Sequence, residues 1–339
     1  MAVAVLGLGG CGGAGDGPRA SASSTSTTVP AGAGAGLAEQ LQQALISAVN
    51  QVRPSVVEIA TSTGLGSGVV YDTTGDIVTN AHVVGDAQEF QVTLADGRTR
   101  AGALVGTYPP DDLAVVRIQG PALPPPATLA DSASVAVGQI VLAVGNPLGL
   151  SSSVTDGIVS FNGRTVAEGN GAVLPATIQT SAPINPGNSG GALIDLNARV
   201  VGIPTLVAGN SESGAAAPGI GFAIPANTVK LIAPQLISSG RVVNTGRAAL
   251  GIRGAGAVSS SGAPVGVVVV AVNTGGPAAR AGIKPGDLIQ AVDGHQVASL
   301  AGLADVMARL RPGATVTVAI ERSGTRSTLS VTLEQLTVG

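Results

Sequence analysis

Short apolar, β-branched runs separated by turn-forming Gly, Asp, Asn and Pro recur from residue 55 to residue 225. Many short strands at fairly regular spacing are typical of an all-β barrel or sandwich. We therefore expect strands at SVVEIAT (55–61), DIVTNAHVV (76–84), LAVVRI (113–118), IVLAVGNP (140–147), GALID (191–195) and GIGFAIP (219–225).

Two other patterns flank this β-rich part. In LAEQLQQALISAVNQV (37–52) the apolar residues have helical spacing, and Pro54 follows. ANTVKLIAPQLISSG (226–240) predicts a helix that closes the unit. From about 247 to 339, strand-like runs alternate with two helical segments, which indicates a small α+β module. The expected domains are 37–240 and 247–339.

Composition excludes several functions. The 339 residues predict about two domains. A net charge of −3 and 1% aromatic residues argue against a nucleic-acid-binding surface. One cysteine and two separated histidines cannot build a usual structural zinc site. The longest apolar run, Val265–Val272, is too short to span a bilayer. We expect no metal, no cofactor and no nucleic-acid partner.

The first residues, MAVAVLGLGGC, resemble a bacterial lipoprotein signal in which Cys11 would be lipidated. The Ser/Thr/Gly/Ala-rich stretch up to residue 36 would then be a flexible tether. This predicts an extracytoplasmic protein held at the outer face of the cell membrane. No Lys or Arg precedes the apolar stretch, so a start upstream of Met1 and a disordered leader with an incidental cysteine both stay open.

Ser189 lies in PINPGNSGGALID (183–195), among residues that favour turns. The segment could be a plain turn, a phosphate-binding loop or the turn that presents a nucleophile. A phosphate loop needs a lysine and a following helix, and neither is present. G-x-S-x-G at 187–191 matches the α/β-hydrolase elbow, but that elbow needs a following helix and the order Ser, Asp, His.

A nucleophilic serine needs a nearby base, and the chain offers only His82 and His295. His82 lies at the end of an apolar strand, whereas His295 lies in a turn of the terminal module. Asp111 and Asp112 precede the strand LAVVRI. The order His82, Asp, Ser189 is that of chymotrypsin-type proteases. Neighbours on a strand point to opposite faces, so only one of the two aspartates can face His82.

Three blocks, TNAHVV, DDLAVVRI and NPGNSGGALID, resemble the catalytic blocks of the HtrA (high-temperature-requirement) family of serine proteases. GSGVVYD, VGNPLGL, SVTDGIVS, IQTSAPI and GIGFAIP agree with it in order. The match runs from about residue 50 to 235, and a PDZ-like module follows. The resemblance implies a mainly β, chymotrypsin-like double β-barrel followed by an α+β PDZ domain.

The family resemblance assigns roles to residues. It implies a catalytic triad of Ser189 as nucleophile, His82 as general base and Asp112 as the residue that orients it. An oxyanion hole would be built at Gly187, Asn188 and Ser189. Pro183 and Ile184 would form the substrate pocket, and both are uncharged, which favours a small or medium aliphatic side chain. The family usually has Asp where this chain has Ser181, and Ala at position 183.

The block GGPAARAGIKPGDLIQAVDGHQV (275–297) resembles the PDZ pattern of these proteases. Such domains add a peptide strand to a sheet edge and hold its carboxylate on backbone amides. The matching amides here belong to Leu250, Gly251 and Ile252. An aromatic residue usual at the start of this loop is absent.

The resemblance therefore predicts an ATP-independent serine endopeptidase that acts on misfolded or unfolded extracytoplasmic proteins, with C-terminal peptides as ligands of the PDZ domain. Family members usually form trimers through an N-terminal segment, so a homotrimer is expected, with the helix at 37–52 as the contact. The alternative is a catalytically silent PDZ-containing chaperone or scaffold. The complete set of His82, Asp112, Ser189 and Gly187 favours the enzyme.

Overall fold

The computed structural model describes residues 31–61, 64–146, 153–167, 173–185, 187–209 and 216–336. Cys11 and the rest of the expected signal lie outside these ranges. The first element, helix α1 (Ala31–Val52), begins at Ala31 rather than at Leu37. Helix propensity does not explain the extension, because three of the six residues of AGAGAG are glycine. The tether expected up to residue 36 is therefore helical in its last part.

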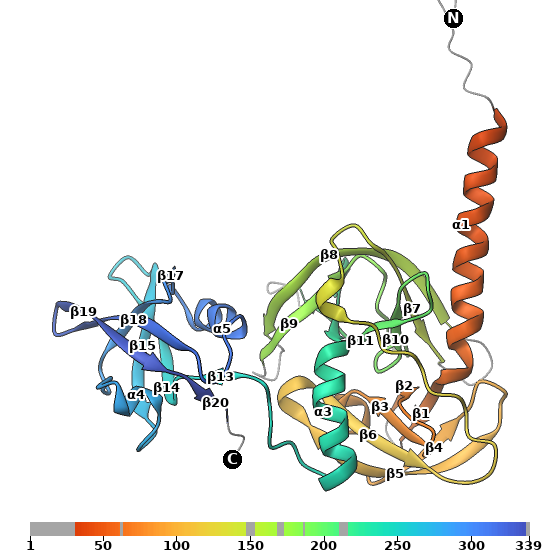
Figure 1. Cartoon of the computed structure of the whole chain (residues 1–339), viewed down its shortest axis with the longest axis horizontal. Coiled ribbons are helices and arrows are strands. Elements are labelled where there is room, and N and C mark those ends of the chain that lie inside the picture. Colours follow the sequence, from red (N-terminus) through yellow and green to blue (C-terminus); the bar gives the residue numbers. More distant parts are fainter. Residues whose placement is uncertain are drawn as a thin grey trace, which may run out of the picture. The chain divides into compact units, whose positions relative to one another are not determined.

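The first barrel is a closed sheet of six antiparallel strands in the order β1-β2-β3-β6-β5-β4 (Figure 1). Its strands are β1 (Val56–Ala60), β2 (Leu65–Val70), β3 (Asp76–Thr79), β4 (Glu89–Thr93), β5 (Thr99–Tyr108) and β6 (Leu113–Ile118). The short helix α2 (Ala81–Val84) follows β3. The strand β5 was not expected from the sequence, because its TRAGALVGTY has few β-branched residues.

The second barrel is closed in the order β10-β11-β12-β9-β8-β7. Its strands are β7 (Ile140–Gly145), β8 (Ser153–Ala167), β9 (Val173–Thr180), β10 (Ala192–Ile194), β11 (Val200–Gly209) and β12 (Ala216–Pro225). Two closed barrels in one chain confirm the double β-barrel expected from the sequence. Closure matters because it leaves no open edge for pairing with other chains.

Alternate residues of the barrel strands pack into different cores. In the first barrel Val57 and Ile59 point into the barrel interior with Phe90 and Ile118. Their neighbours along the strands belong to a second cluster that joins both barrels. This inter-barrel core contains Val56, Val69, Val78, Leu113, Val115, Leu142, Val144, Ala192, Ile194, Val200, Ile203 and Ile224. Burial of both faces explains why these strands have continuous apolar runs instead of strict alternation.

Helix α3 (Ala226–Ser239) covers this inter-barrel core and contacts strands of both barrels. Val229, Ile232 and Leu236 are fully buried at helical spacing. Gly240 ends the helix in the left-handed conformation, with φ of 69°. No helix within the described ranges is long and apolar enough to cross a membrane.

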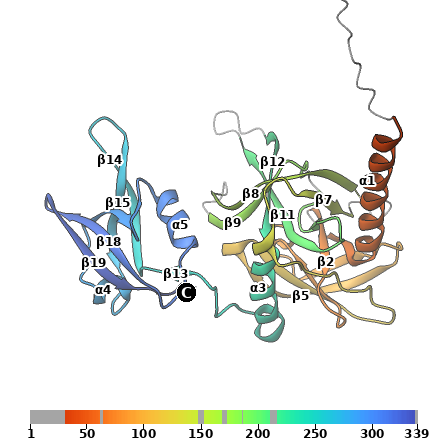
Figure 2. The same cartoon turned by 45° about the horizontal axis from the view of Figure 1, so that its top comes forward.

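The last part of the chain forms an α+β unit with a core of its own, as expected (Figure 2). Its main sheet has the order β14-β15-β16-β18-β19, from β14 (Ile252–Val258), β15 (Pro264–Val272), β16 (Leu288–Val292), β18 (Thr315–Arg322) and β19 (Thr325–Thr332). The short β17 (His295–Gln296) pairs with β16, and β13 (Ala248–Ala249) pairs with β20 (Glu334–Gln335). Two helices accompany the sheet, α4 (Pro277–Arg280) and α5 (Leu300–Ala308).

The packing of the cores predicts that two isoleucines in strands contribute differently to the free energy of unfolding. Ile118 is fully buried inside the first barrel, whereas Ile158 on β8 is 43% exposed. We expect Ile118→Ala to lower the free energy of unfolding by about 2–5 kcal/mol, because a buried cavity remains. Ile158→Ala should cost less than about 1 kcal/mol. Urea unfolding followed by circular dichroism measures both, and equal losses would contradict the assignment of the core.

Candidate active site

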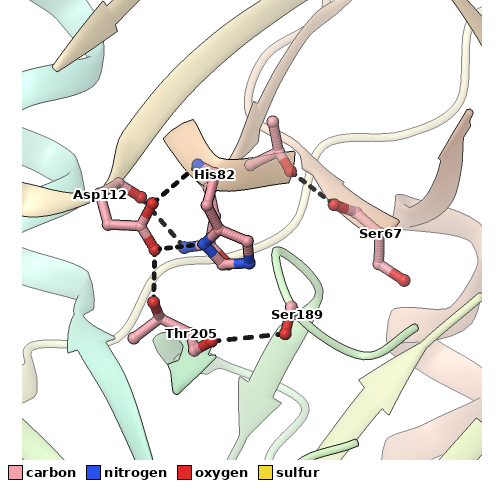
Figure 3. A network of polar contacts seen from close by, with 7 residues as sticks. Ser67, His82, Asp112, Ser189 and Thr205 are labelled. Carbon is pink, nitrogen blue, oxygen red and sulfur yellow. Dashed lines mark hydrogen bonds and ion pairs between the residues drawn. The ribbon is translucent and has the colours of Figure 1, made fainter. Parts of the chain in front are cut away.

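The residues expected to act together come from both barrels: His82 and Ser189 line one cavity, and Asp112 is buried next to His82. His82 lies in α2, directly after β3 of the first barrel, rather than at the end of the strand as expected. Asp112 immediately precedes β6, and Ser189 precedes β10 of the second barrel. Figure 3 shows Asp112, His82, Ser189 and Thr205 in one polar network.

Asp112 holds His82 through two contacts. Its Oδ2 lies 2.8 Å from Nδ1 of His82, and its Oδ1 accepts the His82 backbone N–H at 2.9 Å. Because a carboxylate only accepts, Nδ1 is the donor in this pair. This tautomer leaves Nε2 of the neutral ring with a lone pair that can take a proton. The His82 side chain is 45% exposed and that of Asp112 only 4%, so the base faces the cavity and its partner is buried.

The backbone at Asp112 is unusual. The residue has a φ of 48°, in the left-handed region, where aspartate is tolerated better than most residues. Its carbonyl accepts the backbone N–H of Ala81 and the side-chain amide of Asn80. The segment around His82 is thus held to the segment around Asp112 by backbone as well as side-chain hydrogen bonds.

Thr205 on β11 is a residue that the sequence analysis missed. Its hydroxyl donates to Oδ2 of Asp112, and its side chain is buried. Its carbonyl accepts the hydroxyl of Ser189 at 3.4 Å, a long contact that holds the hydroxyl only loosely. The available signal was a polar residue in the apolar run VVGIPTL, which also fits a plain strand threonine.

The turn around Ser189 depends on glycine because backbone packs directly on backbone. A Cβ at Gly190 would lie 2.2 Å from the carbonyl oxygen of Ser67. A Cβ at Gly191 would lie 2.4 Å from the carbonyl oxygen of Val144. Gly190 also has a positive φ of 79°. The two glycines let the turn lie against strands of both barrels.

Two backbone amides next to Ser189 are available. Among the described residues, the N–H groups of Gly187 and Ser189 have no acceptor. The N–H of Asn188 donates to the carbonyl of Asn185 at 3.1 Å. The Asn188 side chain bonds to the backbone at Asn185 and Pro183. We therefore narrow the expected oxyanion hole to Gly187 and Ser189, because the Asn188 amide is already engaged.

A cavity of about 800 Å³ opens beside these groups. It is lined by His82, Ser189 and Gly187, and by Ile184 from the expected substrate pocket. Ile184 is buried and packs in the core of the second barrel, whereas Pro183 is exposed and does not line this cavity. The only acidic or basic side chains on its wall are His82 and Asp86, within the part of the chain that the structure describes.

Comparison with known proteins agrees with this arrangement. Residues 66–203 match the trypsin-like peptidase domain, and residues 241–333 match the PDZ domain. The chain is 38% identical to serine endoprotease DegS of Escherichia coli over 80% of this chain and 77% of DegS. It is 39% identical to serine protease PepD of Mycobacterium tuberculosis over 84% of this chain and 64% of PepD.

Solved structures give the same result. The HtrA-type protease AlgW with a decapeptide has a TM-score of 0.64 and 32% identity, over 87% of this chain and 99% of AlgW. The chain belongs to the HtrA family of serine proteases. The double barrel of this HtrA-type chain is thus the trypsin-like part, and the α+β unit is the PDZ domain.

The PDZ domain of the HtrA-type chain has a pocket at the expected loop. Leu250, Gly251 and Ile252 line a cavity of about 430 Å³ together with Leu303 and Met307 of α5. Among the described residues, the N–H groups of Leu250 and Gly251 have no acceptor outside the regular elements, while both carbonyls accept backbone N–H groups. The other histidine, His295, is exposed on β17, far along the chain from the residues of the first site.

Asp111, the neighbour of Asp112, has a different partner. Asp111 is buried and pairs with Arg247, which precedes β13, so only Asp112 contacts His82. Burial raises the pKa of Asp111 to about 6, although the Arg247 cation acts in the opposite direction. Tyr108 is packed nearby, and burial raises its pKa to about 12, with Asp111 contributing.

The raised pKa of Asp111 predicts a pH dependence of stability. The folded chain holds this proton more tightly than the unfolded chain, so the contribution of Asp111 decreases as the pH rises from about 4 to about 6. A shift of about 2 units corresponds to at most about 3 kcal/mol. Asp111→Asn should therefore lose less stability than the wild type between pH 4.5 and pH 7 in urea unfolding. Parallel profiles for the two proteins would contradict the raised pKa.

Proposed function

We propose that this chain is an ATP-independent serine endopeptidase that hydrolyses peptide bonds of misfolded or unfolded extracytoplasmic proteins. The observation that carries the proposal is the buried carboxylate of Asp112 on Nδ1 of His82, at a cavity that Ser189 also lines. Family membership supports it, because the curated relatives are named serine proteases.

In the proposed reaction, Nε2 of His82 takes the proton of Ser189 as the hydroxyl oxygen attacks the scissile carbonyl. The carbonyl oxygen becomes an oxyanion, held by the N–H groups of Gly187 and Ser189. His82 then protonates the leaving amine, and a peptide remains as an ester on Ser189. Water, deprotonated by His82, hydrolyses the ester. Asp112 stabilises the imidazolium that forms in each half, with Thr205 fixing its Oδ2.

Substrate choice in this proposal follows from the wall of the cavity. Ile184 offers an aliphatic surface next to Ser189. Position 183 carries an uncharged proline, so a charged side chain would find no partner at either residue of the expected pocket. We therefore assign a small or medium aliphatic side chain, such as Val, Ala or Leu, to the residue before the cleaved bond.

The PDZ domain would capture the C-terminus of a peptide at Leu250, Gly251 and Ile252. The strand β14 lies at the edge of its sheet and so offers unpaired backbone groups to an added peptide strand. The solved relatives named with a decapeptide and a tripeptide support peptide binding as a property of this fold.

Location and assembly extend the same proposal. The relatives DegQ and DegP are named periplasmic, which supports an extracytoplasmic role here. Lipidation of Cys11 would hold the chain at the outer face of the cell membrane. Leu37 and Leu41 of α1 are 68% and 42% exposed, and a homotrimer would bury such apolar residues between copies.

Degradation of unfolded casein tests the proposed reaction. Ser189→Ala should lower the rate at least about 10⁴-fold, because the nucleophile is lost. Ser132→Ala is the matched control, since Ser132 is a buried serine whose hydroxyl accepts the N–H of Asn227. Cleavage by Ser189→Ala at the wild-type rate would overturn the proposal. A folded wild type that never cleaves, with or without hydrophobic C-terminal peptides, would favour a silent chaperone or scaffold.

Fluorescence polarisation with a labelled hydrophobic peptide tests the proposed PDZ site. The same peptide is compared with a free C-terminal carboxylate and with a C-terminal amide. The carboxylate form should bind roughly 10- to 100-fold more tightly, because hydrogen bonds to a charged group are worth about 1.5–3 kcal/mol. Equal affinity of the two forms would exclude carboxylate capture by Leu250, Gly251 and Ile252.

A further inference from the structure

Ser67 of β2 is a buried serine with four hydrogen bonds, and it lies next to the turn that carries Ser189. Its hydroxyl donates to the carbonyl of Gly187 at 2.5 Å and accepts the N–H of Asn146 at 2.9 Å. Its own N–H donates to the carbonyl of Ser189 at 2.9 Å. Its carbonyl accepts the hydroxyl of Thr79 at 2.7 Å. Ser67 of the first barrel thus hydrogen-bonds to two backbone carbonyls of the turn that carries Ser189 in the second barrel.

The hydrogen bond from the Ser67 hydroxyl fixes the peptide plane between Gly187 and Asn188. Its carbonyl is held by the Ser67 hydroxyl, and its N–H donates to the carbonyl of Asn185. The carbonyl and the N–H of this peptide group are therefore both hydrogen-bonded, and a rotation of the plane would break both bonds. Gly187 has a φ of 107°, so glycine is needed to reach this arrangement.

The next peptide plane is fixed as well. The carbonyl of Asn188 accepts the N–H of Gly191 at 3.0 Å. Because N–H and C=O of a trans peptide point in opposite directions, this bond turns the N–H of Ser189 away from Gly191 and leaves it unpaired. The carbonyl of Ser189 is then held by the N–H of Ser67. The N–H of Ser189 lies in the peptide group between the two whose carbonyls Ser67 holds. The N–H of Gly187 lies directly before the first of them, across the Gly187 Cα.

Serine is chemically suited to this position because its hydroxyl donates and accepts at once. Asn146 directly follows β7, so the hydroxyl links the end of β7 to the turn. Alanine would leave the Gly187 carbonyl and the Asn146 N–H without these partners, in a place closed to water. A Cβ at Gly190 or Gly191 would already collide with Ser67 or its neighbours, so the turn has little room to find others.

We infer that Ser67 is a positioning residue for catalysis, which holds the amides of Gly187 and Ser189 in the direction where the oxyanion forms. Ser67 contacts no substrate and acts through the turn. The inference rests on the proposed function, since it requires Ser189 as the nucleophile. It predicts that the transition state, where the charge develops, depends on Ser67 more than substrate binding does.

Steady-state hydrolysis of a fluorogenic peptide by Ser67→Ala tests the inference, with Ser132→Ala as the control for loss of one buried serine hydroxyl. We expect kcat of Ser67→Ala to fall roughly 10- to 100-fold with KM within about twofold of the wild type, the pattern of a lost transition-state contact. Affinity for a peptide aldehyde, whose adduct with Ser189 carries an oxyanion, should fall by the same factor. Ser132→Ala should leave kcat and aldehyde affinity unchanged.

Ser67→Cys keeps a side chain of similar size with a weak donor, and so serves if the alanine variant does not fold. Its kcat should lie between those of wild type and alanine. A kcat of either variant equal to that of Ser132→Ala, or a loss seen only as a higher KM, would overturn the inference. If Ser189→Ala is inactive in the same assay, such an outcome refutes the role of Ser67 and leaves the proposed function standing. If Ser189→Ala still cleaves, the proposed function fails and the inference fails with it.

Discussion

The apolar core between the two barrels is the interaction on which the site depends. Val56, Val78 and Val115 of the first barrel meet Val144 and Ile194 of the second in one cluster. His82 and Asp112 are carried by one side of this contact and Ser189 by the other. A shift of one barrel against the other would separate base from nucleophile without disturbing either barrel. The hydrophobic contact is therefore a condition for the polar site, and α3 reinforces it by packing on both barrels.

Polar contacts also cross this boundary. Thr205 of the second barrel donates to Asp112, and Ser67 of the first barrel binds the carbonyls of Gly187 and Ser189. Each bond joins a residue of one barrel to a functional segment of the other. The apolar core supplies most of the free energy of association in such a contact, whereas the hydrogen bonds fix its register.

Much of the fold could be predicted from the sequence, because strands buried on both faces have continuous apolar runs, as in LAVVRI and IVLAVG. Strands with little β-branched content, such as β5 and β14, could not be recognised in that way. The pairing of His82 with Asp112 followed from the resemblance to the family, because motif order alone left Asp111 open. The roles of Thr205 and Ser67 depend on contacts across 93 and 120 positions in the chain, which no local pattern contains. The engagement of the Asn188 amide was likewise invisible, because it is set by the turn's own conformation.

The direct packing of backbone on backbone at the turn has a consequence for redesign. At Gly145, Gly190 and Gly191 an added Cβ would meet main-chain atoms at 2.2–2.6 Å, so no repacking of side chains can make room. These positions are closed to variation of any kind. Leu65, Val83 and Ile184 line the cavity beside Ser189. Libraries that aim at new cleavage preferences are therefore best confined to such walls, where shape can change while the reacting groups stay in register.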